Sequence, residues 1–302
     1  MTASLCEEVI RKLTETYPNL RSETLTVTAY GRPVRTLVFG SGDRHVLFTA
    51  AHHANEWITA MVLLQFAEDF ADALQSGGSL YGVPARTIDR YCTVHLVPMV
   101  DPDGVDLVTG AIKPVSPEYT AARAIAGNFP LIPFPDGWKA NLLGVDLNLQ
   151  YPAGWLRARE IKFSQGFTRP APRDYVGRAP LTQREAAALA QYTEDVNPAL
   201  VLAYHTQGKV IYWQFEDYDV PGARELAEEF SRVSGYALED TPENSAYAGY
   251  KDWFIRIFRR PGFTVEAGSG ESPLPLSQFP EIYRDNLGIL VTAALGLPAK
   301  NG

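Results

Sequence analysis

The sequence predicts a three-layer α/β/α sandwich around a mixed, largely parallel β-sheet. Segments with the apolar spacing of amphipathic helices alternate along the chain with short strand-like runs. Several of these runs are apolar on both sides, as are parallel strands that are buried on both faces. No shift in composition divides the 302 residues, so we predict one domain that spans residues 1–302.

The N-terminal part of the chain is predicted to contain two helices and four strands. Apolar residues recur at helical spacing from Leu5 to Leu13, which predicts a helix over residues 4–16. A second helical pattern covers residues 57–74 and is followed by a Gly-Gly pair. Strands are expected at residues 23–30, 33–39, 44–51 and 91–97.

Residues 101–180 are dense in proline and glycine but are also rich in aromatic side chains. Disordered linkers are poor in aromatic residues, and long ordered loops are usually functional. We therefore expect an ordered, loop-rich segment that covers an active face.

Regular structure is expected again in the last part of the chain. Thr182 followed by Glu185 matches a capping box, which predicts the start of a helix that runs to Val196. Two more helices are expected over residues 221–234 and 280–295, the first with Pro221 in its first turn. The expected strands are residues 199–204, 209–215 and 263–266.

Charge and cysteine content argue against several classes of protein. The 27 Lys+Arg against 35 Asp+Glu give a formal net charge of −8, which argues against a nucleic-acid partner. Cys6 and Cys92 are too few for a disulfide framework and are expected to be reduced.

The longest apolar runs, such as residues 289–297, are shorter than the roughly 20 residues that cross a bilayer. The first residues lack a signal-peptide pattern, so we expect a soluble, cytoplasmic protein with no membrane partner.

Two neighbouring histidines and a glutamate follow the buried strand at residues 44–51. His53 and Glu56 are three residues apart on a turn that enters a helix, a spacing at which both side chains can reach one zinc ion. His52 is an alternative ligand, because it also lies close to Glu56 in sequence. A catalytic zinc needs a third protein ligand, and His205 lies at the end of the strand at residues 199–204. The two other histidines, His45 and His95, lie within strand-like runs and are expected to be structural.

A candidate general base closes another predicted strand. Glu266 ends the run at residues 263–266 and is followed by a glycine-rich turn. An acidic residue in this position is either a carboxylate that caps the strand end or a residue of the site, and spacing alone leaves both open.

Four ordered motifs resemble the zinc carboxypeptidase family. They are residues 53–59 (HANEWIT), residues 144–148 (GVDLN), His205 and residues 263–266 (FTVE). The resemblance implies a zinc-carboxypeptidase-like fold and one Zn²⁺ per chain. Its ligands would be His53, Glu56 and His205, which resolves the choice against His52, and Glu266 would be the general base.

Longer strings are similar to the bacterial γ-D-glutamyl-L-diamino acid endopeptidases. They are WKAN at residues 138–141, HTQGKVIYW at residues 205–213 and PGFTVEAGSGESPLPLSQF at residues 261–279. This resemblance implies hydrolysis of the γ-D-glutamyl–meso-diaminopimelate bond, with peptidoglycan-derived peptides as partners. An oligomeric state is not indicated.

The resemblance also assigns supporting roles. Lys139 stands where the family has an arginine, and it is expected to stabilise the oxyanion, although a surface lysine is the alternative. Asp146 is expected to orient His53, although it could be a plain turn residue. Leu149 replaces the arginine that holds a substrate carboxylate in digestive members, so a different group must serve there.

Residues beside the motifs are candidates for substrate contacts. Asn148 and Lys209 could hold a carboxylate, and Gln207 could line the pocket. A tyrosine on a mobile loop contacts substrate in some members of the family. Tyr247 is favoured over Tyr250, which lies nearer to the apolar Trp253.

Three functions follow in order of preference. The first is a zinc peptidase that hydrolyses γ-D-glutamyl–diaminopimelate bonds in muropeptides. The second is a conventional metallocarboxypeptidase that acts on ordinary peptides. The third is a non-catalytic muropeptide-binding module, which the presence of all three ligands and the base disfavours.

Overall fold

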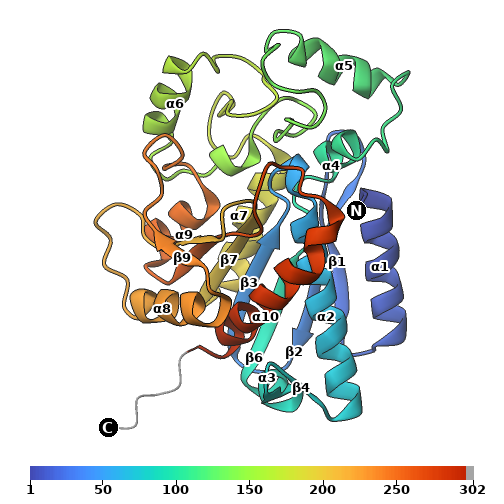
Figure 1. Cartoon of the computed structure of the whole chain (residues 1–302), viewed down its shortest axis with the longest axis vertical. Coiled ribbons are helices and arrows are strands. Elements are labelled where there is room, and N and C mark those ends of the chain that lie inside the picture. Colours follow the sequence, from blue (N-terminus) through green and yellow to red (C-terminus); the bar gives the residue numbers. More distant parts are fainter. Residues whose placement is uncertain (297–302) are drawn as a thin grey trace.

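A mixed sheet of eight strands forms the centre of the molecule (Figure 1). The computed structural model describes residues 1–296. Across the sheet the strand order is β1-β2-β6-β3-β7-β10-β8-β9. The strands are β1 (Arg21–Val27), β2 (Pro33–Gly40), β3 (Arg44–Ala50), β6 (Cys92–Val97), β7 (Leu200–His205), β8 (Val210–Tyr212), β9 (Ala237–Glu239) and β10 (Gly262–Glu266). A separate two-stranded ribbon pairs β4 (Ser79–Leu80) with β5 (Val83–Pro84).

The four central strands β6, β3, β7 and β10 run parallel, while β1 and β2 extend the sheet antiparallel. Ala50 of β3 is paired with Tyr204 of β7, and His205 of β7 with Glu266 of β10. The segments that leave these strands therefore meet at one edge of the sheet. Ligands bind at this edge in open α/β sheets.

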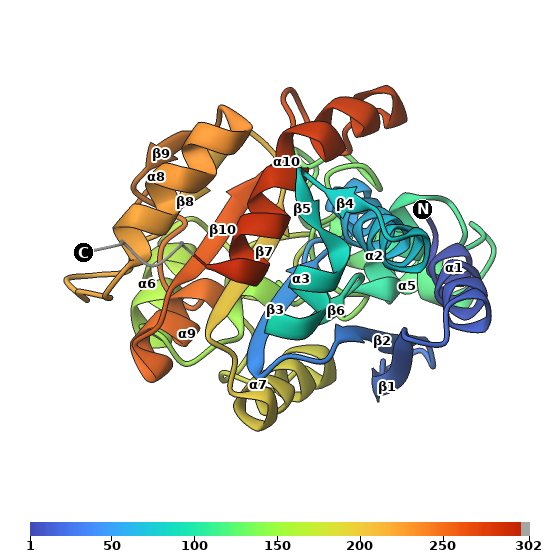
Figure 2. The same cartoon turned by 90° about the horizontal axis from the view of Figure 1, so that it is seen from below.

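Helices cover both faces of the sheet (Figure 2). One layer holds α2 (Ile58–Ser76), α8 (Ala223–Ser234) and α10 (Phe279–Leu295), with α1 (Ala3–Thr16) and α3 (Ala85–Tyr91) packed beside them. The other holds α7 (Arg184–Val196) and α9 (Tyr250–Phe258). The predicted sandwich around a mixed, largely parallel sheet is thus confirmed. The single-domain prediction extends over residues 297–302, which lie outside the described residues.

Each face of the sheet is sealed by aromatic side chains. On the α2 side the rings of Phe39 and Phe70 stack with centroids 4.3 Å apart, and both are fully buried. On the other side the rings of Tyr151, Tyr250 and Trp253 lie within 6.0 Å of one another. Burial of aromatic rings of this size supplies a large share of the hydrophobic stabilisation.

Residues 101–180 form an ordered segment above the carboxyl ends of the parallel strands (Figure 1). They contain α4 (Pro102–Val108), α5 (Pro117–Ala126), the short 3₁₀ helix η2 (Leu147–Leu149) and α6 (Trp155–Ser164). The expectation of ordered loops is met. The helices within this segment were not predicted, because proline and glycine dominate its local pattern.

Two predicted helix starts are wrong. The helix α7 begins at Arg184 after Gln183, and no side chain caps its N-terminus. The hydroxyl of Thr182 instead donates to Oε1 of Gln150 at 3.0 Å, and Glu185 is buried. The helix α8 begins at Ala223 rather than at Pro221, because Gly222 takes a left-handed conformation with φ of 77°. Tertiary contacts replaced the local capping pattern in the first case.

We find no helix within residues 1–296 whose length and hydropathy would let it cross a bilayer.

Candidate active site

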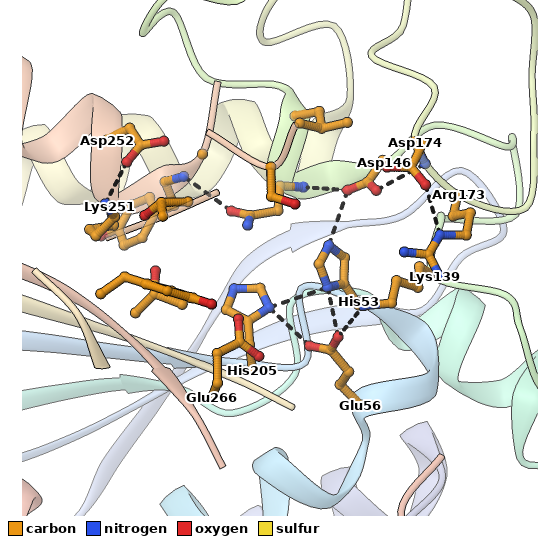
Figure 3. A pocket seen from close by; sticks show the side chains of 18 of the residues that line it. His53, Glu56, Lys139, Asp146, Arg173, Asp174, His205, Lys251, Asp252 and Glu266 are labelled. Carbon is orange, nitrogen blue, oxygen red and sulfur yellow. Dashed lines mark hydrogen bonds and ion pairs between the residues drawn. The ribbon is translucent and has the colours of Figure 1, made fainter. Parts of the chain in front are cut away.

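Three side chains from two parallel strand ends meet at the edge of the sheet (Figure 3). His53 and Glu56 lie on the turn after β3. His53 immediately precedes the 3₁₀ helix η1 (Ala54–Glu56), and Glu56 is the last residue of that helix. His205 is the last residue of β7. Nδ1 of His53 lies 3.0 Å from Oε1 of Glu56, and Nδ1 of His205 lies 2.9 Å from Oε2 of the same carboxylate. The two Nδ1 atoms are 3.2 Å apart. The structure thus brings together the three residues that were expected from the sequence to be metal ligands.

The donor set fits a zinc ion. Two imidazole nitrogens and one carboxylate are ligands that zinc prefers, and tetrahedral bonds of 2.0–2.2 Å place neighbouring donors about 3.4 Å apart. The three donor separations, 2.9 to 3.2 Å, are close to this value. Within residues 1–296, the group of three side chains that could share one metal ion is His53, Glu56 and His205. These residues would hold the metal.

Asp146 fixes the orientation of His53. Its Oδ1 lies 3.2 Å from Nε2 of His53, so the other ring nitrogen, Nδ1, is directed at Glu56 and His205. Backbone N–H groups of Asn148 and Asp174 donate to the same carboxylate at 3.1 Å. Although burial opposes ionisation, His53 and these hydrogen bonds lower the pKa of Asp146. A carboxylate in this position sets the ring tautomer for metal binding.

His52, the alternative ligand, points away from the cluster. Its Nε2 lies 3.2 Å from the hydroxyl of Tyr151, and its ring stacks beside that of His205 with centroids 5.7 Å apart. Burial lowers its pKa well below the usual value, so the ring is neutral. The structure places His52 in the core beneath the cluster.

Glu266 and the ligand cluster line one cavity of about 250 Å³. Burial, reinforced by the carboxylate of Glu56, raises the pKa of Glu266 to about 8. Because β10 pairs with β7, Glu266 stands directly beside His205. In its ionised form, a carboxylate in this place can accept a proton from water that lies at the cluster, and the raised pKa makes it a stronger base.

Two cations form one wall of the cavity. Nζ of Lys139 lies 2.7 Å from Oε1 of Glu56, and the Lys139 side chain is mostly buried. Nε of Arg173 donates to Oδ2 of Asp174 at 2.7 Å, while its two terminal nitrogens bind no acceptor within residues 1–296. A second hollow begins on the far side of this wall, and Lys139 and Arg173 line both. Positive charge therefore borders both hollows.

The remaining candidates from the sequence divide into two groups. Asn148 and Gln207 line the cavity, and Oδ1 of Asn148 accepts the N–H of Tyr250. Lys209 and Tyr247 are not brought to the cavity. Nζ of Lys209 forms ion pairs with Glu281 and Asp285 of α10, at 2.6 and 3.2 Å.

The two tyrosines are held by packing. The ring of Tyr247 covers Gly154, whose missing Cβ would lie 2.5 Å from Cδ1 of that ring. Tyr250 lines the cavity, but its hydroxyl hydrogen bonds with that of Thr193 at 2.8 Å in the core. Neither hydroxyl points into the cavity in this conformation.

Sequence reasoning missed five charged groups in the wall: Lys162 and the adjacent pairs Arg173–Asp174 and Lys251–Asp252. Each pair interrupts a segment of aromatic or proline residues, PAPRDYV for the first and AGYKDWF for the second. Charged residues are seldom buried without a partner, so an adjacent pair of opposite charges in an apolar segment was the available signal.

Comparison with known proteins gives the same picture. The family model described as zinc carboxypeptidase matches residues 6–288. The chain is 45% identical to gamma-D-glutamyl-L-diamino acid endopeptidase 1 of Lysinibacillus sphaericus, over 93% of this chain and 69% of that protein.

Solved structures share the fold at low sequence identity. Bovine thrombin-activatable fibrinolysis inhibitor is 16% identical with a TM-score of 0.74, over 97% of this chain and 96% of that chain. The murein-tripeptide amidase MpaA of Escherichia coli O157 is 18% identical with a TM-score of 0.56, over 92% of this chain and 93% of that chain. With its His₂Glu cluster at the carboxyl ends of the central strands, the chain belongs to the zinc carboxypeptidase family and is a zinc metallopeptidase.

Proposed function

We propose that the enzyme hydrolyses the γ-D-glutamyl–meso-diaminopimelate amide bond in peptidoglycan stem peptides and muropeptides. The observation that carries this proposal is a cavity with cationic groups on both sides of the His53–Glu56–His205 cluster, in a chain that lacks the terminal-carboxylate arginine at Leu149. A substrate with carboxylates on both sides of its scissile bond suits this arrangement. The 45% identity to an endopeptidase named for γ-D-glutamyl-L-diamino acid bonds supports the same substrate class.

The side chains divide the chemistry among themselves. Bound zinc supplies a Lewis acid for the carbonyl and lowers the pKa of water. Glu266 accepts the proton of the attacking water and delivers it to the nitrogen of the leaving amine. The ammonium of Lys139, directed at the cluster, stabilises negative charge as it develops on the carbonyl oxygen. Asp146 keeps His53 in its ligating orientation.

Arg173 is the group that we assign to the γ-glutamyl residue. A γ-linked glutamate keeps its α-carboxylate on the acyl side of the scissile bond. The terminal nitrogens of Arg173 are free of protein acceptors within residues 1–296, and Arg173 lines both hollows. A guanidinium pairs with a carboxylate through two parallel hydrogen bonds, which Leu149 cannot offer.

The substrate assignment is tested with the zinc-loaded protein and the peptide L-Ala-γ-D-Glu-meso-diaminopimelate. We expect release of diaminopimelate, followed by chromatography, and loss of that release in Glu266→Gln at unchanged zinc content. Cleavage of a reporter with a hydrophobic C-terminal residue, without release of diaminopimelate, would favour a conventional carboxypeptidase. Binding of the muropeptide without hydrolysis by the zinc-loaded protein would favour a non-catalytic module.

The cytoplasmic location expected from the sequence stays a prediction. Fractionation of cells that produce the protein tests it.

A further inference from the structure

A buried ion pair lies at the end of the cavity opposite Lys139 and Arg173 (Figure 3). Lys251 and Asp252 occupy the first turn of α9, both line the cavity, and each side chain is 4% exposed. Nζ of Lys251 lies 2.7 Å from Oδ1 of Asp252. Burial of two charges has a large desolvation cost, which only good geometry and further hydrogen bonds offset.

The protein satisfies this pair only in part. The ammonium of Lys251 donates to the carbonyl of Gln214, and it has three N–H groups in all. Oδ1 of Asp252 is buried and contacts the ammonium of Lys251 at 2.7 Å without the alignment of a hydrogen bond, and no other group within residues 1–296 donates to it. Buried polar groups in native proteins nearly always find partners, so unused capacity beside a substrate cavity indicates a ligand.

We propose that Lys251 and Asp252 bind the distal amino-acid centre of the diamino acid, with Lys251 on its carboxylate and Asp252 on its ammonium. This inference rests on the proposed function. Diaminopimelate carries both groups at the far end of its side chain, whereas lysine carries an ammonium alone. The pair therefore makes Lys251 the residue that selects diaminopimelate over lysine.

The placement of the pair agrees with the polarity of the substrate. Figure 3 shows His53 and His205 between Lys251 on one side and Arg173 on the other. With the γ-glutamyl carboxylate at Arg173, the leaving diamino acid extends toward α9. The ring of Tyr250, which precedes Lys251, lies 5.6 Å from His52, beneath the cluster. Because Lys251 and Asp252 line the same cavity as the cluster, a diamino acid side chain that extends through this cavity meets the first turn of α9.

A purely structural role is the competing explanation. Lys251 ties the start of α9 to the segment after β8 through Gln214, and this tie alone could stabilise the fold. A structural role would affect all substrates equally. Recognition of a carboxylate would affect only substrates that carry it.

The test compares two peptides that differ by one carboxylate, L-Ala-γ-D-Glu-meso-diaminopimelate and L-Ala-γ-D-Glu-L-Lys. We expect the parent enzyme to favour the first by about tenfold or more in kcat/KM, since its distal carboxylate gives the buried ammonium of Lys251 a partner that the second peptide lacks. In Lys251→Met the ratio falls toward one, mainly through KM for the diaminopimelate peptide. Lys251→Arg keeps the charge and retains a preference. Lys209→Met, which removes an ion-paired lysine outside the cavity, leaves the ratio unchanged.

Each outcome separates the inference from the proposed function. Equal kcat/KM for both peptides in the parent, or an equal drop for both in Lys251→Met, overturns the role of the pair while the proposed function stands. Hydrolysis of neither peptide by the zinc-loaded parent overturns the proposed function itself. If Lys251→Met does not fold, the parent is assayed with a peptide whose distal carboxylate is amidated. A loss like that with lysine supports the inference, and an unchanged rate refutes it.

Discussion

Replacing Glu185 with glutamine is expected to stabilise the protein above neutral pH. Glu185 lies in the first turn of α7, where the sequence spacing predicted a capping box, and it is 3% exposed. Burial raises its pKa to about 7, and the neighbouring carboxylate of Asp103 adds to the shift. The favourable position near a helix N-terminus does not offset this.

The sign and size follow from linkage. In the unfolded chain the carboxyl ionises near its ordinary pKa of 4.5, so between pH 4.5 and about 7 the folded state holds a proton that the unfolded state has lost. Stability contributed by this group therefore falls as pH rises through that window. This difference in pKa between the folded and unfolded states lowers the free energy of unfolding by about 3 kcal/mol at pH 8. Roughly 2 kcal/mol of that loss develops above pH 5. Glutamine carries no charge and escapes the penalty.

The assay is urea unfolding of the metal-free protein at pH 5 and pH 8, so that metal binding does not contribute. Glu185→Gln should gain about 2 kcal/mol in unfolding free energy over the parent between the two pH values. Glu194→Gln makes the same change at an exposed position of α7 and should show no such gain. A Glu185→Gln advantage that is the same at both pH values would refute the reasoning.

Three further variants test the site. Glu266→Gln should lower kcat for the γ-D-glutamyl peptide by about 10²- to 10⁴-fold at unchanged zinc content, and full activity would exclude it as the base. Asp146→Asn should weaken zinc affinity by about 10- to 100-fold in chelator competition, because the orienting carboxylate of His53 is lost; unaltered affinity would contradict that role. Arg173→Gln should raise KM for the γ-D-glutamyl peptide and remove the parent's preference for it over the α-amidated peptide. A retained preference would show that another group binds this carboxylate.

Much of the framework could be predicted from the sequence. The helix α2 and the strands β3 and β7 could be predicted from local apolar patterns. The helix packs one apolar side on the sheet, and the two strands are buried on both sides in the middle layer. Parallel strand ends meet at one edge of a sheet, so the residues that follow β3 and β7 had to approach each other. The strand ends made these residues candidates, and the resemblance to the zinc carboxypeptidase family then named His53, Glu56 and His205 rather than His52 before any geometry was known.

The wall of the cavity could not be predicted in the same way. Lys209 and Lys251 are both lysines close to a strand or helix end, yet one pairs with α10 at the surface and the other is buried in the cavity. Arg173 belongs to a proline-rich segment without periodicity, and its position depends on the course of that segment over the sheet. The local sequence of a loop does not determine which of its side chains point into the cavity.

The sequence by itself therefore determined the sandwich through periodicity, while the ligand trio and the expected base came from the ends of strands together with the ordered motifs that resemble the family. Only the tertiary structure decided that Glu185 is buried, that Lys209 is remote and that Lys251 and Asp252 line the cavity. The physical reason is that burial and charge pairing arise between segments far apart in the chain, where packing of the whole molecule outweighs local preference.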